Sequence, residues 1–240
     1  MSRSTTPRRN RPFWVGALVV SVIVSLIITL LSLFAVWWAP NMGIYHYLEV
    51  TSEVNLPMWW NVLLLIVAAT LMFLVAANTP SRSARLAWRT MAVIALLMSL
   101  DDATMLHEKL GMIVERFAPA TGMTFTWVLL GGPIALAVVI MAIMASRKMH
   151  KTPRRLLVSG FVVFLGAAVG FEFIADYLIR TEVHWFLYRV TYHLEEGLEM
   201  VGAALIAVAP LSNIQRVRLT GQIDSAGGGT APWAEAPAGR

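Results

Sequence analysis

Long apolar runs along this chain alternate with short polar connections. Six of these runs are about 20 to 26 residues long, which is the length that an α-helix needs to cross the hydrocarbon layer of a bilayer. A helix also satisfies its backbone hydrogen bonds within the span, as that layer requires. We therefore predict an all-α fold, a polytopic membrane bundle of six transmembrane helices. The predicted spans are Phe13–Trp38, Met58–Ala77, Leu86–Leu106, Thr124–Ala145, Leu156–Tyr177 and Phe186–Leu211.

The first apolar run is predicted to be an uncleaved span. It is longer than the core of a signal peptide, and Phe34–Trp38 offers no small-residue cleavage site. We predict three segments, which are a basic cytoplasmic segment at 1–12, the six-helix transmembrane domain at 13–212 and a disordered cytoplasmic tail at 213–240 whose last 20 residues are rich in Gly, Ala and Pro.

Composition supports the membrane class. Hydrophobic residues make up 58% of the chain and charged residues only 14%, and the mean hydropathy is +0.67. The net charge of +5 does not indicate a nucleic-acid partner, because the basic residues fall in short groups between the apolar runs. With no cysteine, the chain has no disulfide and no thiolate site. Carboxylates, histidines and hydroxyls must supply any chemistry.

Lys and Arg are concentrated at one set of predicted helix ends. Cytoplasmic loops of membrane proteins carry such an excess, so we predict that both termini are cytoplasmic and that the protein lies in the cell membrane, as in a bacterial inner membrane. The opposite ends carry only Lys109, Arg116, Arg180 and Arg189. The cytoplasmic ends carry Arg82, Arg85, Arg89, Arg147, Lys148, Lys151, Arg154, Arg155, Arg216 and Arg218.

Acidic side chains lie inside the third, fifth and sixth predicted spans. A carboxylate at membrane depth costs about 2.5 to 3.5 kcal/mol even on the mildest insertion scale, so each one suggests a functional site. With the predicted topology and a rise of about 1.5 Å per residue, the acids of all three spans fall in the outer half of the bilayer. The sixth span begins with the densest group, Tyr192–Met200.

Helical phase indicates which of these acids face together. At about 100° per residue, Asp101 and Glu108 share one face of the third span, whereas Asp102 and His107 fall on its flanks. The other shared faces hold Glu172 and Asp176 on the fifth span and His193, Glu196 and Glu199 on the sixth, with Glu195 at the edge.

These acids outnumber the cations near them. Carboxylates a few Å apart in a low dielectric share protons, pair with cations or bind a metal ion. Only Lys109, Arg180 and Arg189 are close enough to pair. Carboxylates mixed with histidine suit Fe, Mn or Zn. We therefore predict that the site binds one or two of these divalent ions. The predicted ligands are Asp101, Glu108, Glu172, Asp176, His193, Glu196 and Glu199.

Further residues have candidate roles beside the ligands. His107, or a carboxylate that binds no metal such as Glu195, is the candidate general base. Both also have a structural interpretation, since Glu195 can extend to the interface and His107 can form a local hydrogen bond. In the loop after the first span, Glu53 and Asn55 either close the pocket entrance or cap the second helix, and capping is favoured.

Glycines predict where helices pack closely. Gly166 and Gly170 form a small-xxx-small pair on the fifth span, and Gly197 and Gly202 give the sixth span small faces. Such residues let helix backbones approach one another in membranes.

Three functions remain open. The first is a metal-dependent enzyme that acts on a membrane lipid or another hydrophobic substrate entering from the bilayer. The second is a proton- or cation-coupled transporter, although the inner halves of the spans lack Asp, Glu and His. The third is a non-catalytic accessory subunit. The pattern does not define an oligomeric state.

Several motifs carry a resemblance to known families. Leu100–Glu108, Glu195–Met200 and Glu53-x-Asn55-x-Pro57 resemble a group of bacterial multi-pass membrane proteins with no established activity, over all six spans. Glu53-x-Asn55 before a Trp-rich span and Asp101-x₅-His107 also resemble the alkaline ceramidases, which implies a membrane hydrolase. The chain differs from ceramidases in having six spans and no His-x-x-x-His motif. That family is therefore an alternative only.

Overall fold

The computed structural model describes residues 12–38, 43–50, 55–117, 123–182 and 184–220. Within these ranges the chain is helical and contains no strand. Six of the helices, α1, α3, α4, α6, α7 and α8, are long and apolar enough to cross a membrane, which confirms the predicted all-α class and the number of spans. The helices are α1 (Phe13–Trp38), α2 (Ile44–Leu48), α3 (Leu56–Ala77), α4 (Arg82–Thr104), α5 (Leu106–Phe117), α6 (Val128–Ser146), α7 (Lys151–Arg180) and α8 (Trp185–Thr220).

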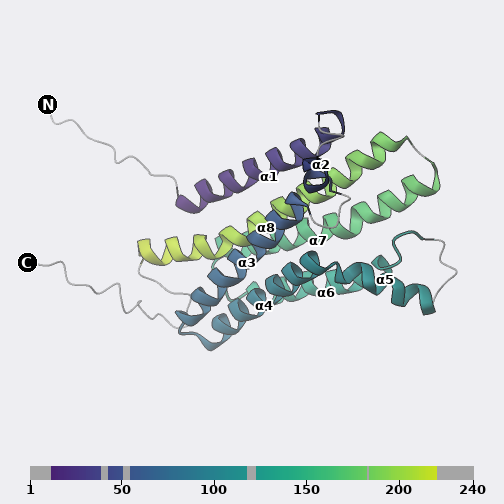
Figure 1. The fold of residues 1–240 in the computed structure, drawn as a ribbon. Coiled ribbons are helices and arrows are strands. Elements are labelled where there is room, and N and C mark those ends of the chain that lie inside the picture. The colour runs from purple at the N-terminus through teal and green to yellow at the C-terminus, as the bar shows by residue number, and fades with distance from the viewer. Residues whose placement is uncertain (1–11, 39–42, 51–54, 118–122, 183, 221–240) are drawn as a thin grey trace, which may run out of the picture.

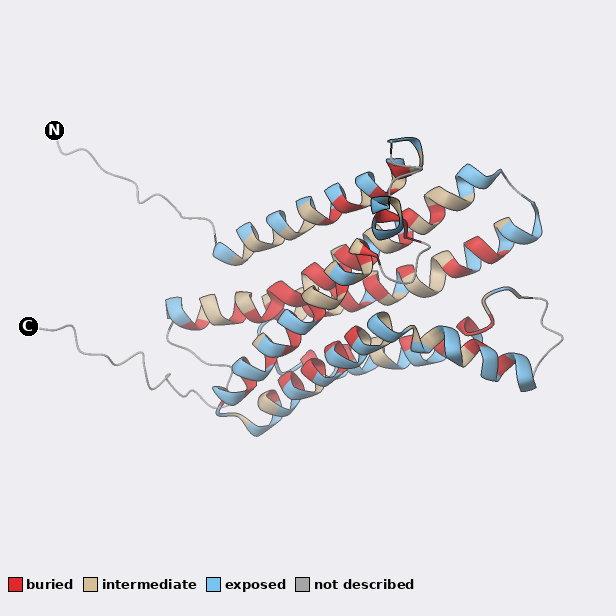
Figure 2. Cartoon of the chain, viewed as in Figure 1, coloured by how far each residue is buried: buried red, intermediate tan, exposed pale blue. Residues whose placement is uncertain are grey.

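The spanning helices run up and down, so that α1 begins and α8 ends at the same end of the bundle (Figure 1). Helix α8 is central and packs against α1, α3 and α7, while α4 packs on α3 and α6 packs on α7. The core between α3, α4, α7 and α8 combines large side chains such as Trp88 and Phe161 with many alanines. Buried positions face this core, and exposed positions lie on the outward faces of the helices (Figure 2).

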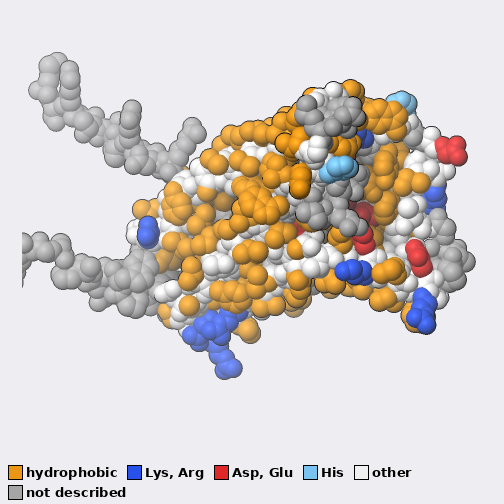
Figure 3. Space-filling model, viewed as in Figure 1, with side chains coloured by type: hydrophobic (Ala, Val, Ile, Leu, Met, Phe, Trp, Pro, Cys, Tyr) orange, Lys and Arg blue, Asp and Glu red, His pale blue; other side chains and the backbone are white. Residues whose placement is uncertain are grey.

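The outward faces are themselves apolar. Exposed large side chains such as Val20, Leu97 and Leu136 occur along the spanning helices, and the space-filling view shows a largely hydrophobic flank (Figure 3). A helix that is hydrophobic on all sides is typical of a membrane span. The fold therefore indicates a multi-pass membrane protein.

The two ends of the bundle differ in charge. We call the end where α4 and α7 begin and α6 and α8 finish the arginine-rich end. On the face seen in Figure 3, acidic side chains lie toward the other end. The Lys and Arg residues of the arginine-rich end are Arg82, Arg85, Arg89, Arg147, Lys148, Lys151, Arg154, Arg155, Arg216 and Arg218.

Asn55 caps helix α3. Its side-chain oxygen accepts a hydrogen bond of 2.7 Å from the backbone N–H of Met58, and its amide donates to the Val50 carbonyl at 3.1 Å. Pro57 occupies the first turn, where its missing N–H costs nothing. The capping interpretation is confirmed for Asn55, whereas Glu53 lies outside the described residues.

The third predicted span, Leu86–Leu106, corresponds to α4, and the residues after it form a separate helix, α5. Helix α4 ends at Thr104, and Met105 adopts a left-handed conformation with φ of 52° before α5 begins. The helical phase that placed Asp101 and Glu108 on one face therefore does not continue past Met105. At the other end of the chain, α8 continues beyond residue 212 to Thr220, as a helix that includes Pro210.

Close packing of α7 on α8 involves Gly202, which was predicted, and Gly160, which was not. A Cβ atom at Gly202 would lie 2.7 Å from the Phe164 backbone nitrogen, and one at Gly160 would lie 2.9 Å from the Gly202 carbonyl oxygen. At Gly166 and Gly170 an added Cβ would meet nothing within 4 Å. The prediction is thus confirmed for Gly202 and wrong for the Gly166 pair, which does not lie at the close contact.

Candidate functional site

A cavity of about 680 Å³ lies among α4, α5, α6, α7 and α8. Helices α4 and α7 run in the same direction, and the last residues that each contributes to the lining are acidic. The rest of the lining is mostly apolar. We call it the apolar section, and it includes Ile94, Met98, Ile134, Val138, Phe164 and Val169. We call the five carboxyl side chains the acidic section, which consists of Asp101, Asp102, Glu172, Glu195 and Glu199.

Asp101 connects the end of α4 to the start of α5. Its Oδ1 accepts a hydrogen bond of 2.8 Å from the backbone N–H of His107, and its Oδ2 lies 3.1 Å from His107 Nδ1. The His107 ring also packs against Trp127, with ring centroids 4.9 Å apart. Asp101 therefore orients an imidazole that lines the cavity.

The environment of His107 favours its protonated form. Burial alone would lower the pKa of this imidazole, but the hydrogen bond and charge of Asp101, together with the nearby Glu172 and Glu108, raise the pKa above its usual value. This imidazole is therefore a stronger base than an ordinary histidine and can accept a proton at the acidic section.

Two acids of the section have neutral hydrogen-bond donors. The Trp127 indole Nε1–H donates to Glu172 Oε2 at 3.0 Å, and the Asn61 amide donates to Glu199 Oε2 at 3.3 Å. Sequence reasoning did not assign Trp127 or Asn61 to the site. An asparagine inside an otherwise apolar span was the signal for Asn61, because a polar side chain at that depth needs a partner.

Other buried carboxyl oxygens have no partner among the described residues. They are Asp102 Oδ2, Glu195 Oε2, Glu196 Oε2 and, beside α2, Glu49 Oε1. Glu195 lines the cavity and is only 7% exposed. Asp102, Glu196 and Glu199 are near enough for their charges to interact. Buried polar atoms are almost always satisfied, so these oxygens require a proton, a water molecule or a bound cation.

Asp176 and His193, two of the predicted ligands, have other partners in the structure. Asp176 accepts a hydrogen bond of 2.6 Å from the backbone N–H of Thr124 and pairs with Arg180, so the loop before α6 covers it. His193 lies against α1, with its Nε2 atom 3.0 Å from Ser32 Oγ and its Nδ1 atom 2.7 Å from the Arg189 carbonyl oxygen.

The cavity lining also differs from the predicted ligand set. Glu108 is exposed on α5 and does not line the cavity. Asp102 and Glu195, which helical phase put at the edges of their faces, do line it. Within the described ranges, no group of three or more His, Asp or Glu side chains has an arrangement that could hold a metal ion.

A second polar group ties α2 to α1 and α8. Arg189 donates to Glu49 Oε2 at 2.6 Å and to the Ser32 and Leu33 carbonyls, while the Tyr45 hydroxyl donates to the same Glu49 oxygen at 2.5 Å. Burial would raise the pKa of Glu49, but these bonds and the arginine charge outweigh it and lower the pKa. Arg189 is thus committed to Glu49 and does not neutralise the acidic section.

Comparison with curated proteins and with solved structures finds no match. A family model described as a domain of unknown function (DUF8692) matches residues 13–212, which include all of α1 to α7 and most of α8. The matched region contains the cavity and every residue of its acidic section. The chain therefore belongs to the DUF8692 family.

Proposed function

We propose that this protein is a metal-dependent membrane enzyme that binds a lipid or another hydrophobic molecule in the cavity and acts on its polar group. The observation that carries the proposal is the division of one cavity into an apolar section and an acidic section. An amphipathic molecule has the same division. A volume of about 680 Å³ also lies within the range of about 300 to 1,000 Å³ that is usual for small-molecule sites.

The partnerless oxygens support a bound cation. Asp102, Glu195 and Glu196 each have a buried carboxyl oxygen that no described residue satisfies, and Glu199 is close to Asp102 and Glu196. In the proposal these four residues hold the divalent ion, which is Fe, Mn or Zn. Their side chains do not point to one common position in the structure, so they would have to rotate to bind the ion together. Bound there, the ion would activate water or a substrate oxygen as a Lewis acid.

His107 is the proposed general base. It lines the cavity, and Asp101 holds it through one hydrogen bond to the His107 backbone N–H and one to the ring Nδ1. A carboxylate that orients an imidazole and stabilises its charged form is a common arrangement in proton-transfer sites. The base would accept a proton through Nε2, since Nδ1 faces Asp101.

The placement of the acids supports a transporter less well than an enzyme. Each acid of the described spanning helices lies in the last part of α4 or α7 or in the first half of α8. A proton relay would need ionisable groups toward the arginine-rich end as well. A site open to one leaflet fits this distribution better.

The test is the metal content of the purified protein and the hydrophobic molecules that copurify with it. We expect about one equivalent of a transition metal, which Glu196→Gln and Asp102→Asn each reduce at least ten-fold. Glu108→Gln is the matched control, because this acid is next to His107 on α5 but is exposed to solvent. Folded, metal-free wild-type protein in metal-supplemented medium would overturn the metal assignment. Equal loss in the control would also contradict it.

The lipid part has its own test. Replacing Val138 in the apolar section by Trp should displace any copurifying amphiphile while leaving the metal content unchanged. Retention of the same molecule would show that it binds elsewhere.

A further inference from the structure

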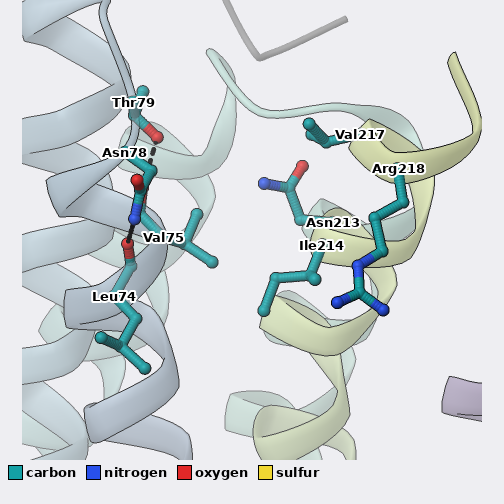
Figure 4. Close-up of a pocket in the computed structure, with 8 residues that line it drawn as sticks. All are labelled: Leu74, Val75, Asn78, Thr79, Asn213, Ile214, Val217 and Arg218. Atoms are coloured by element: carbon teal, nitrogen blue, oxygen red, sulfur yellow. Dashed lines mark hydrogen bonds between the residues drawn. The ribbon is translucent and has the colours of Figure 1, made fainter. Parts of the chain in front are cut away.

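A second cleft opens between α3 and α8 at the arginine-rich end, with a volume of about 340 Å³. The two helices face each other across it, and side chains from both extend into the gap (Figure 4). It is far along α8 from the acidic section, because its α8 residues begin at Asn213 whereas the acids end at Glu199. The cleft is therefore a separate feature from the cavity.

One part of the cleft is apolar and the other is polar. The apolar wall consists of Leu74, Val75, Ile214 and Val217. Helix α3, which carries Leu74 and Val75, ends at Ala77. Since α3 is one of the spanning helices, the cleft lies where the helix leaves the hydrocarbon layer and meets the head groups. A molecule in the cleft would have an apolar part on one side and a polar part on the other.

Arg218 supplies the charge of the polar part. Asn78 and Thr79 donate their side-chain hydrogen bonds to the carbonyls of α3, at 2.8 and 2.7 Å, so those donors are occupied. By contrast, no described carboxylate forms an ion pair with Arg218. The Asn213 amide projects into the space between the helices, and the Arg218 side chain extends along α8 so that its guanidinium lies near Ile214 (Figure 4). Both can donate hydrogen bonds to an anion.

The surroundings favour an anion strongly. The described residues of the arginine-rich end include ten Lys and Arg side chains and no Asp or Glu. Their summed field attracts negative charge to this end of the bundle, and it is strongest where solvent is partly excluded. Basic pockets between membrane helices bind the head groups of anionic lipids for this reason.

We propose that the α3–α8 cleft binds an anionic phospholipid of the leaflet at the arginine-rich end. The phosphate accepts hydrogen bonds from Arg218 and Asn213, and one acyl chain lies along Leu74 and Ile214. The bound lipid connects the ends of α3 and α8 and stabilises the bundle. This site is independent of the proposed enzyme function.

The test uses the full-length protein in a zwitterionic detergent, with thermal unfolding followed during titration with phosphatidylglycerol or phosphatidylcholine. We expect phosphatidylglycerol alone to raise the Tm of the wild type in a saturable way. Arg218→Ala should weaken the apparent affinity about five-fold or more, from the contribution of about 1 kcal/mol that one basic residue makes at a lipid surface. Arg155→Ala is the matched control, since this exposed arginine is at the same end but outside the cleft.

Each result has a defined meaning. An equal loss in both arginine variants would show a general surface attraction and would overturn the cleft assignment. An equal effect of the two lipids on the wild type would overturn it as well. If glycerol 3-phosphate alone reproduced the stabilisation, the site would bind a free phosphate ester and the lipid would be excluded. Ile214→Trp, which fills the apolar wall, should abolish the lipid effect but retain the wild-type Tm without lipid within a few degrees.

Discussion

The buried carboxylates of this protein fall into two kinds according to whether a described cation pairs with them. Glu49 Oε2 accepts bonds from Arg189 and Tyr45, and its ion pair with Arg189 is almost fully buried. Glu49 Oε1 has no partner among the described residues, but the other oxygen of this carboxylate is paired with Arg189. Glu195, which is buried, and Asp102, which is partly buried, each have a carboxyl oxygen without a partner and form no ion pair with a described cation. The first kind stabilises the fold, whereas the second must gain a proton or a ligand. The unsatisfied acids are therefore the better functional candidates.

The pair of Glu49 and Arg189 predicts a pH-dependent stability. The pKa of Glu49 is lowered in the folded protein, so its ionised form stabilises the fold above the unfolded pKa of about 4.5, and this contribution is lost as the pH falls through the folded pKa. We expect Glu49→Gln to cost about 3 kcal/mol at pH 7, because it leaves a buried arginine charge unpaired. The difference from the wild type should shrink between about pH 5 and pH 3.

Unfolding of both proteins in detergent across this pH range measures the effect. A wild-type advantage of constant size from pH 7 to pH 3 would contradict the prediction. Glu108→Gln, at an exposed position, serves as the control for a general change in charge.

At the scale of the elements, the contact of α7 with α8 depends on two glycines. Gly160 and Gly202 bring the two backbones so close that a Cβ at either would clash with backbone atoms of the other helix. Backbone approach of this kind increases van der Waals contact, which is the main attraction between helices in lipid. The α7–α8 pair in turn contributes Glu172, Glu195 and Glu199 to the cavity lining.

We expect Gly202→Ala to destabilise the protein by about 1 to 3 kcal/mol, which is the usual cost of overpacking. Its Cβ would lie 2.7 Å from the Phe164 nitrogen, and that backbone cannot easily retreat. Gly166→Ala is the matched control on the neighbouring helix. With nothing within 4 Å of its Cβ, it should be neutral or stabilise by up to about 1 kcal/mol, because alanine favours helix.

Chemical unfolding or thermal inactivation in one detergent compares the two variants. Similar destabilisation by both would mean that α7 and α8 do not approach at Gly202 as described.

At the scale of the whole molecule, charge asymmetry predicts the orientation in the membrane. Arginine and lysine concentrate at the end where α4 and α7 begin, while the acidic section lies toward the opposite end. By the positive-inside rule we expect the arginine-rich end to be cytoplasmic. The candidate site would then open toward the outer leaflet, and the proposed lipid cleft would belong to the inner leaflet.

The absence of cysteine from the sequence makes this orientation easy to test. Ser83 and Thr181 are exposed positions at the two ends. In intact cells, a membrane-impermeant maleimide should label Thr181→Cys, whereas Ser83→Cys should react only after the membrane is opened. The parent chain should give no signal. The reverse pattern would show that the acidic section faces the cytoplasm.

The sequence predicted the parts of the fold that depend on local pattern. Length and hydropathy defined six spans, and Asn55 with Pro57 marked the start of α3. Helical phase failed where the backbone departs from one regular helix, as at Met105. It also did not identify the residues that each acid or histidine contacts, because helical phase gives only the direction of a side chain on its own helix. Thus His193 faces Ser32 on α1, and Asp176 faces the loop before α6.

By itself, the sequence determined that this is a helical membrane protein with costly acids in three spans, because the length of an apolar run and the energy of a buried charge are local properties. Only the tertiary structure decided which acids line the cavity, which are satisfied and which glycines hold α7 on α8. These outcomes depend on contacts between residues far apart in the chain, such as Asn61 with Glu199 and Trp127 with Glu172. The periodicity of a single helix contains no information about those distant partners.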